Sequence, residues 1–267
     1  MKSSLNLKNY RVLRFKFAFL LYYSMDFATF QGQKYRKDCK WIGLTSKNIN
    51  SLDEIEGLDN LSELTGLVLS GNQISEIKDL DTFTNLTYLD LSLNKIKEIK
   101  GLHNLRNLTY LSLIGNQITE IKGFENLKNL KILNLNSNKI TKIKGFQNLK
   151  NLKHLSLNCN KITEIKGLET LANLQKLNLS NNNISKISRF GKLEQLRELC
   201  ISNNKISNLH GIEELQNLEE LLATYNNISD ISCLHNLQKL QIVDFDGNPL
   251  TKEQFETLYK LYMKAVY

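Results

Sequence analysis

Histidine and cysteine are the side chains of this sequence that most often perform catalysis or hold metal ions. His103, His154, His210 and His235 are scattered along the chain. A metal site needs several such ligands in one place, and a catalytic triad needs a nucleophile beside its base. The sequence also contains no glycine-rich phosphate-binding loop. We therefore expect no enzyme, no metal site and no cofactor. The four cysteines form no C-x-x-C pair and are expected to be reduced thiols, and they are Cys39, Cys159, Cys200 and Cys233.

Two pairs of side chains suited to binding recur at a spacing of 22 residues. Tyr88 and Tyr110 form the first pair, and Glu198 and Glu220 form the second. Exposed aromatic side chains are typical anchors of protein interfaces, and carboxylates attract lysine and arginine. Both pairs indicate recognition if the fold brings together residues that are 22 positions apart.

The same spacing runs through most of the chain. Residues 86–173 consist of four consecutive copies, LTYLDLSLNKIKEIKGLHNLRN, LTYLSLIGNQITEIKGFENLKN, LKILNLNSNKITKIKGFQNLKN and LKHLSLNCNKITEIKGLETLAN. An internal repeat of this length predicts a solenoid in which each copy stacks on its neighbours. One asparagine holds the same place in nine copies, and the nine are Asn72, Asn94, Asn116, Asn138, Asn160, Asn182, Asn204, Asn226 and Asn248.

Each copy predicts one short strand followed by a turn. In the first of the four copies, Leu89 and Leu91 alternate with Tyr88 and Asp90, as in a strand with one buried face. The remaining apolar positions fit neither a strand nor a helix. The asparagine follows the strand where the chain turns inward, and its amide can bond backbone groups of its own coil and a neighbouring one. We expect it to satisfy polar groups that would otherwise be buried without a partner.

The pattern LxxLxLxxNxIxxIxxLxxLxx in these copies resembles the leucine-rich-repeat family. The resemblance covers about residues 41–250 and is closest to the 22-residue subclass typified by the leucine-rich-repeat regulatory subunit of protein phosphatase 1. It implies a curved right-handed α/β solenoid, with short parallel strands on the concave face and tight turns or 3-10 segments on the convex face. It also implies a protein partner bound inside the curve. Internalins share the period but are rich in proline after the second isoleucine, whereas this chain has only Pro249, so the resemblance favours the intracellular type.

The limits of the repeat set the predicted domains. Residues 1–40 form an N-terminal extension, residues 41–250 form a degenerate first coil with nine 22-residue repeats, and residues 251–267 form a capping helix. Thr251 and Gln254 have the spacing of a capping box, and the apolar residues that follow share one helical face.

Three interpretations of the extension stay open. Residues 13–21 alternate as in an amphipathic strand, and the longest apolar run, 17–23, is too short to span a bilayer. The extension is then a structured cap, a membrane or targeting segment, or a non-native start with Met25 as the true initiator. Contact with a membrane is expected only through residues 1–30.

Counting in steps of 22 predicts which side chains face outward from the concave sheet. The N-terminal third is aromatic and aliphatic, the middle is mostly Asn and Ser with His154 and Lys176, and the C-terminal third is acidic. Because Glu198 and Glu220 would repel each other on adjacent strands, a partner with a basic segment would offset that cost. Two alternatives are that the extension covers the aromatic third and that the acidic charges are simply solvated. The expected partner-binding residues are Trp41, Tyr88, Asp90, Leu93, Tyr110, Ile114, Ile132, Glu198, Glu220, Leu222, Tyr225, Asp244 and Asp246.

The opposite face carries a row of lysines. Glutamates two positions earlier in the repeat would neutralise much of this row. The net charge of +8 permits an acidic partner, nucleic acid or an anionic membrane. A nucleic-acid track would need unopposed basic groups with aromatic residues between them, so a solvated face is favoured. The row consists of Lys78, Lys100, Lys122, Lys144 and Lys166.

These patterns predict a monomeric, non-enzymatic scaffold or adaptor of the cytoplasm or nucleus, whose concave face binds a protein with a basic segment. A phosphatase-type regulatory subunit is the narrower form of this prediction. The alternative is a protein that binds nucleic acid or an anionic membrane surface through the lysine row and the basic N-terminus.

Overall fold

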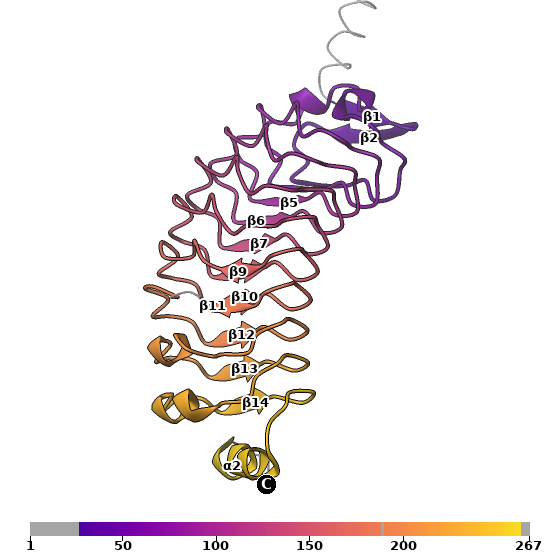
Figure 1. Ribbon diagram of the computed structural model, residues 1–267. Coiled ribbons are helices and arrows are strands. Elements are labelled where there is room, and N and C mark those ends of the chain that lie inside the picture. Colours follow the sequence, from indigo (N-terminus) through magenta and orange to yellow (C-terminus); the bar gives the residue numbers. More distant parts are fainter. Residues whose placement is uncertain (1–26, 188–189, 263–267) are drawn as a thin grey trace, which may run out of the picture.

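The computed structural model describes residues 27–187 and 190–262 and forms a curved solenoid (Figure 1). Ten short strands pair in sequence order to form one parallel sheet along the concave side. This arrangement confirms the fold class predicted from the repeat. The strands are β3 (Trp41–Gly43), β4 (Gly66–Val68), β5 (Tyr88–Asp90), β6 (Tyr110–Ser112), β7 (Ile132–Asn134), β8 (His154–Ser156), β10 (Lys176–Asn178), β12 (Glu198–Cys200), β13 (Glu220–Leu222) and β14 (Ile242–Asp244).

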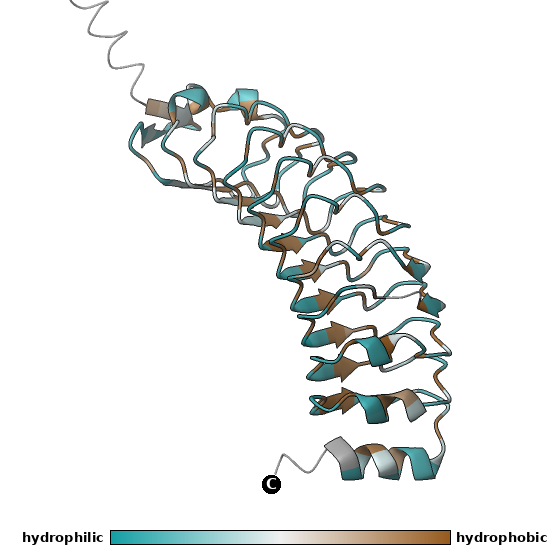
Figure 2. Cartoon of the chain, turned by 90° about the vertical axis from the view of Figure 1, so that its left-hand side faces the viewer, coloured by the Kyte–Doolittle hydropathy of each residue, from teal (hydrophilic) through white to brown (hydrophobic). Residues whose placement is uncertain are grey.

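The apolar positions of each coil point into a shared core. Leu89, Leu91 and Ile96 are each at most 1% exposed, and Tyr88 and Asp90 beside them remain half-buried on the outer face. Buried side chains of this size contribute about 1.5–3 kcal/mol each through the hydrophobic effect. The core is one cluster that extends through the stack. In Figure 2, hydrophobic segments recur in the strands from coil to coil along the stack.

The return segments of the coils are mostly turns. They include the 3-10 helices η1 (Leu52–Glu54), η2 (Leu58–Asn60), η3 (Ile212–Glu214) and η4 (Ser232–Asn236), and one strand pair, β9 (Glu164–Ile165) with β11 (Lys186–Ile187). Gly123 shows why these turns need glycine: its φ is 83°, and an added Cβ would lie 2.3 Å from the carbonyl oxygen of Ile99.

A hairpin and a helix lie at the two ends of the described chain. Strands β1 (Phe27–Phe30) and β2 (Gln33–Arg36) pair antiparallel and bury Ala28, Phe30 and Tyr35 against the core. At the other end, α2 (Lys252–Tyr262) lies next to the last coil (Figures 1 and 2). Its Leu258 is buried in the core cluster.

Several expectations concern the ends of the chain. The strand pattern at 13–21 and the possible start at Met25 lie outside the described residues, and the predicted domain limits stay predictions. No helix within residues 27–187 and 190–262 is long and apolar enough to cross a membrane.

Candidate functional site

Three aromatic side chains form a continuous group at the N-terminal end of the concave face, here named the aromatic cluster (Trp41, Tyr88, Tyr110). The rings of Tyr88 and Tyr110 lie parallel within 2°, with centroids 4.2 Å apart. The ring of Trp41 lies 4.8 Å from that of Tyr88 at an angle of 39°. Trp41 reaches across strand β4 because Gly66 has no side chain there: an added Cβ would lie 1.9 Å from Trp41 Cε3. The cluster is therefore a preformed apolar surface, and Trp41 remains 51% exposed.

Neighbouring groups determine the protonation state of Tyr88 and the polarity around the aromatic cluster. Burial, and then the neighbouring Tyr110, raise the pKa of Tyr88 to about 12, so its hydroxyl stays neutral. Asp90, on the same face, accepts hydrogen bonds from the backbone N–H and the hydroxyl of Ser92. Ile132 pairs in register with Tyr110 and extends the apolar surface by one strand.

The middle of the concave face is polar, and its polar groups largely hydrogen-bond to one another. Asn136 Oδ1 accepts bonds from Ser156 Oγ at 2.7 Å and from the backbone of Asn158 at 2.8 Å. A hollow of about 280 Å³ lies beside them, lined in part by His154 and Cys200. Burial, and then the nearby lysine, lower the pKa of His154. Burial, and then two glutamates, raise the pKa of Cys200 to about 11, so this thiol stays protonated and is a poor nucleophile.

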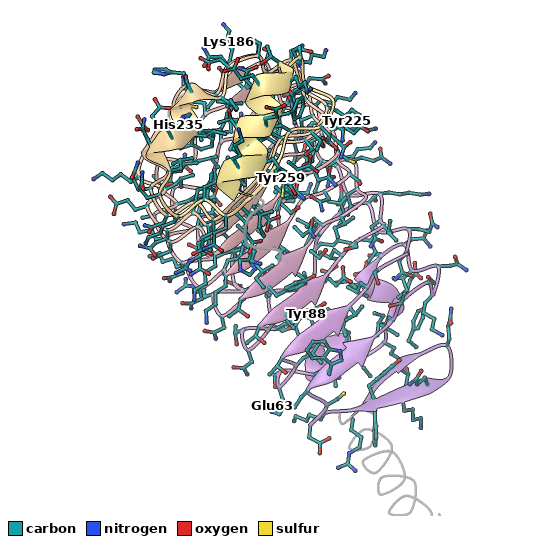
Figure 3. The ribbon with its side chains drawn as sticks, turned by 90° about the horizontal axis from the view of Figure 1, so that it is seen from below. Glu63, Tyr88, Lys186, Tyr225, His235 and Tyr259 are labelled. Carbon is teal, nitrogen blue, oxygen red and sulfur yellow. The ribbon has the colours of Figure 1, made fainter. Side chains whose placement is uncertain are left out.

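Four carboxylates gather at the other end of the sheet, here named the acidic end (Glu198, Glu220, Asp244, Asp246). Glu198 and Glu220 are paired in register on adjacent strands. Lys176 Nζ lies 2.7 Å from Glu198 Oε1, and this hydrogen bond raises the pKa of Lys176. One lysine cannot compensate four carboxylates, so the acidic end attracts cations. Figure 3 shows Tyr88 over the strands and Tyr225 toward the opposite end of the molecule.

Every residue expected to bind the partner lies in a strand of the ten-stranded sheet or within three residues after one. The structure brings them together as two groups, the aromatic cluster with its apolar neighbours and the acidic end. Strands β6 and β12 have three strands between them, so the groups are about 19 Å apart. Residues 27–40 leave Trp41 half exposed, so this part of the extension does not cover the cluster.

The nine repeated asparagines form an inner row that joins the coils. Asn116 illustrates the geometry. Its Oδ1 accepts from the backbone N–H of Ile96 at 2.9 Å, and its Nδ2 donates to the carbonyl oxygens of Leu91 at 3.0 Å and Leu113 at 3.1 Å. Since two of these partners belong to the preceding coil, the row joins successive coils.

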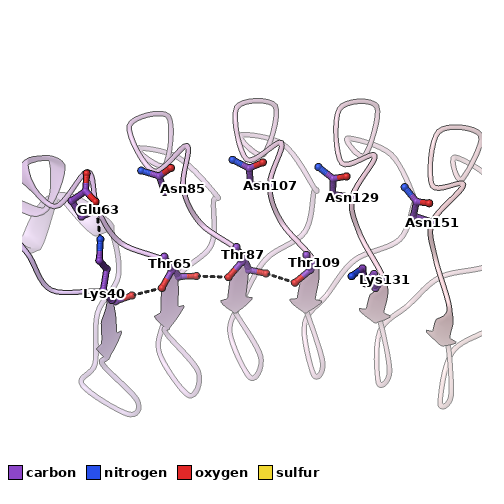
Figure 4. A pocket seen from close by; sticks show the side chains of 10 residues that line it. All are labelled: Lys40, Glu63, Thr65, Asn85, Thr87, Asn107, Thr109, Asn129, Lys131 and Asn151. Atoms are coloured by element: carbon purple, nitrogen blue, oxygen red, sulfur yellow. Dashed lines mark hydrogen bonds and ion pairs between the residues drawn. The ribbon is translucent and has the colours of Figure 1, made fainter.

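A second, outer row of asparagines was missed by sequence reasoning. Asn107 Nδ2 donates to the carbonyl oxygen of Thr84 at 2.9 Å, one coil earlier, and the other members act in the same way. Together with a row of threonines, these side chains line a groove of about 530 Å³ (Figure 4). Their 22-residue spacing, three residues before the start of each strand, is the signal that would have identified them. The asparagines that line the groove are Asn85, Asn107, Asn129 and Asn151.

The lysine row is partly neutralised by acidic groups of neighbouring coils. Lys122 Nζ lies 3.7 Å from Glu98 and Lys144 Nζ lies 3.6 Å from Glu120, each glutamate being 24 positions earlier. Within the described part of the chain, no group of three or more His, Cys, Asp or Glu side chains is placed to hold a metal ion.

Known repeat proteins match this chain along most of its length. A family model for a leucine-rich repeat region matches residues 105–264, and a second leucine-rich-repeat model matches residues 62–118. No curated protein matches the chain. Among solved structures, an internalin (inlF) from Listeria monocytogenes is 28% identical over 85% of this chain and 80% of that one, with a TM-score of 0.53.

Two further structures are similar. Internalin C2 from Listeria monocytogenes is 29% identical over 82% of this chain and 86% of that one, with a TM-score of 0.61. A chain in the TLR13–ssRNA13 complex is 28% identical over 77% of this chain, with a TM-score of 0.70, and the match spans only 32% of that chain.

Proposed function

Because the chain belongs to the leucine-rich-repeat family, we propose that it is a non-enzymatic interaction scaffold whose concave face binds a partner protein. The observation that carries the proposal is the concentration of partly exposed aromatic and acidic side chains on that one face. Exposed aromatic rings and adjacent like charges both cost free energy in the unbound protein, and a bound partner offsets both costs.

The chemistry of the face defines the partner. The aromatic cluster suits apolar side chains, and the acidic end suits a segment that carries lysine or arginine. The polar groups between the two ends hydrogen-bond to one another. They can contact the partner but offer it few unsatisfied donors or acceptors. The partner is therefore a protein with an apolar contact region and a basic segment about 19 Å away.

A narrower form of the proposal is that this partner is a phosphatase. Tyr88, Asp90, Tyr110, Glu198 and Glu220 are the residue types that the phosphatase-regulator subclass uses on its concave face. Mixing the purified chain with the catalytic subunit of protein phosphatase 1 tests this form. Absence of binding at micromolar concentration would rule out the narrower form without affecting the scaffold proposal.

The proposed setting is a reducing compartment, the cytoplasm or nucleus, with the chain acting as a monomer. Cys39, Cys159, Cys200 and Cys233 are all free, as this setting requires. Light scattering after size exclusion should give a mass close to 30.8 kDa.

Binding of RNA or an anionic membrane through the lysine row is the competing function, and the RNA in the TLR13 complex makes it worth testing. The ion pairs on the row reduce its free charge. Titrations with RNA and with phosphatidylserine vesicles at increasing salt distinguish the two. Binding that weakens steeply with salt and survives Glu198→Lys/Glu220→Lys favours the competing function.

Affinity capture followed by mass spectrometry tests the scaffold directly. Tyr88→Ala/Tyr110→Ala should lose a captured partner at least tenfold, because the aromatic cluster supplies its apolar contact. Lys122→Gln/Lys144→Gln on the convex face is the matched control and should retain the partner. Equal capture of every protein by wild type and the tyrosine variant would rule out the cluster as a binding site.

A further inference from the structure

One stretch of the chain carries a concentrated positive charge. Residues 126–163, which include strands β7 and β8, contain eight lysines and no arginine, aspartate or glutamate. Their charge of +8 equals the formal net charge of the whole chain, so the charges of all other residues cancel. Each of these lysines is exposed. They are Lys128, Lys131, Lys139, Lys142, Lys144, Lys150, Lys153 and Lys161.

A change of residue type interrupts the ion pairs of the lysine row in this stretch. Lys100, Lys122 and Lys144 each lie 3.6–3.8 Å from a glutamate 24 positions earlier. The residue 24 positions before Lys166 is Lys142, where the three preceding coils have glutamate. Two positive charges therefore occupy the place of an ion pair, and like charges on neighbouring coils repel each other.

A second pair of lysines lies on the same two coils. Lys139 and Lys161 directly follow the inner asparagines and hold equivalent positions. The coils on either side have Gln117 and Asn183 at this position, so neutral residues separate the pair from the next lysines of the column. Within residues 27–187 and 190–262, no ion pair joins these two lysines, Lys142 or Lys166 to a carboxylate. The four form a surface here named the basic flank (Lys139, Lys142, Lys161, Lys166).

The glutamates around the basic flank do not cancel its charge. Glu120 is already engaged by the lysine row. Glu164 is half-buried and faces Lys186 in the register of strands β9 and β11. Glu125 and Glu169 each accept a hydrogen bond from the backbone of their own turn. The basic flank therefore keeps a net positive charge.

We propose that the basic flank is a second interaction surface, which binds a short acidic segment of a protein. The flank lies on the return segments, outside the ten strands of the concave sheet, so it is separate from the aromatic cluster and the acidic end. Lys139 and Lys142 are three residues apart, and an extended chain spans at most about 3.6 Å per residue, so about 11 Å separates the two lysine pairs at most. A run of about six aspartates or glutamates reaches both pairs and offsets the repulsion within each.

The form of the basic flank favours an acidic protein segment over nucleic acid. Two coils occupy about 10 Å of the stack, whereas the major groove of a duplex alone is about 12 Å wide. Single-stranded nucleic acid binds through exposed aromatic rings. Phe146, the one Phe, Tyr or Trp residue in 126–163, is buried.

The form of the flank also disfavours an anionic membrane. A membrane surface is flat and would contact the return segments of many coils together. In the coils before residue 126, lysines and glutamates of these segments pair with each other. Only a narrow ligand meets the lysines of the basic flank without meeting those pairs.

Fluorescence anisotropy of a labelled octaglutamate peptide with the full chain tests the proposal. Wild type should bind this peptide and should not bind an octaglutamine peptide. Lys139→Gln/Lys161→Gln should weaken binding about tenfold, because half of the charge of the flank is lost. Lys95→Gln/Lys205→Gln is the matched control, since it removes the same charge from the same column outside the flank. The control should bind octaglutamate as wild type does.

Lys142→Glu is a second test that protects the fold. It restores the glutamate of the preceding coils and gives Lys166 a partner. Binding of octaglutamate should fall at least tenfold, while the urea midpoint should be equal to that of wild type or higher. A clearly lower midpoint would show that Lys142 serves the fold and would overturn the inference.

Three further results would overturn the inference. Absence of octaglutamate binding at millimolar peptide and low salt would do so, and equal losses in the two double variants would show attraction by net charge alone. Tighter binding of octauridylate RNA or phosphatidylserine vesicles than of octaglutamate, with a loss in Lys142→Glu, would assign the flank to phosphate groups. Tyr88→Ala/Tyr110→Ala should leave octaglutamate binding unchanged, so the test is independent of the concave face.

Discussion

The position of Trp41 depends on a residue that has no side chain. Gly66 belongs to β4, and its missing side chain provides the space in which the indole ring lies and meets Tyr88. The sequence places Trp41 and Tyr88 in one column of the concave face. It does not reveal the ring contact across an intervening strand, because that contact depends on side-chain torsions and on the empty space above Gly66.

Gly66→Ala should displace the indole ring and remove its contact with Tyr88, which is worth about 0.5–1.5 kcal/mol beyond burial. Trp41 is the only tryptophan, so its fluorescence reports the change directly. We expect a red-shifted emission and faster quenching by iodide. Gly43→Ala, where a Cβ meets nothing within 4 Å, is the matched control. Identical spectra for the two variants would contradict this account of the cluster.

His154 should make stability depend on pH. Its pKa in the folded state lies below the ordinary value of 6.5, mainly because of burial, so the unfolded chain binds the proton more tightly. The contribution of the neutral ring is present above pH 6.5 and is lost as the pH falls below it. When the pH is lowered from 7.5 to 5.5, the free energy of unfolding, measured with urea, should therefore fall less for His154→Asn than for wild type. His235→Asn, in the exposed part of η4, is the control, and equal losses in wild type and His154→Asn would contradict the prediction.

The two rows of asparagines show how elements of the solenoid are joined. The inner row satisfies buried backbone groups of two successive coils, and its members are nearly all buried. The outer row joins successive coils at the exposed edge. Sequence periodicity located the inner row and its role but missed the outer row, because an exposed asparagine has no pattern that distinguishes a bridging amide from a solvated one. The hairpin at 27–36 could not be predicted from the repeat at all, since it lies outside the period.

Asn116→Ala should cost about 2 kcal/mol, because it leaves the buried N–H of Ile96 without its partner. It also removes one of the two asparagine donors from the carbonyl oxygens of Leu91 and Leu113. Asn107→Ala in the outer row should cost about 1 kcal/mol, since water can replace its bond. Urea unfolding of both variants measures the difference. Equal costs would show that the inner asparagines do not hold the coils together.

At the scale of the whole molecule, the solenoid places residues that are 22 positions apart in the sequence next to each other in space. Residues such as Leu111 and Leu133 are adjacent because each coil contacts only the next, so counting predicts the concave columns. The same counting cannot predict the left-handed backbone at Leu93 or Tyr225, because a positive φ is a property of the turn and not of the residue type. The convex ion pairs likewise join neighbouring coils, which only the stacked structure reveals.

These convex pairs should contribute little to the stability of the whole molecule. Their atoms are 3.6–3.8 Å apart and their side chains are about half exposed, and such pairs are worth about 0–1 kcal/mol. Replacing Lys100, Lys122 and Lys144 together with glutamine should shift the urea midpoint only slightly. A large loss of stability that disappears in 1 M salt would show that the pairs are important to the fold.

Hydroxyl-radical footprinting of the chain with and without a captured partner tests the central claim most directly. Trp41, Tyr88, Leu93, Tyr110 and Tyr225 should all be protected by the partner, since radicals react readily with these side chains. Tyr259, exposed on α2 outside the concave sheet, should react equally in both samples. Protection confined to the convex turns, with all five of these side chains still reactive, would contradict the account.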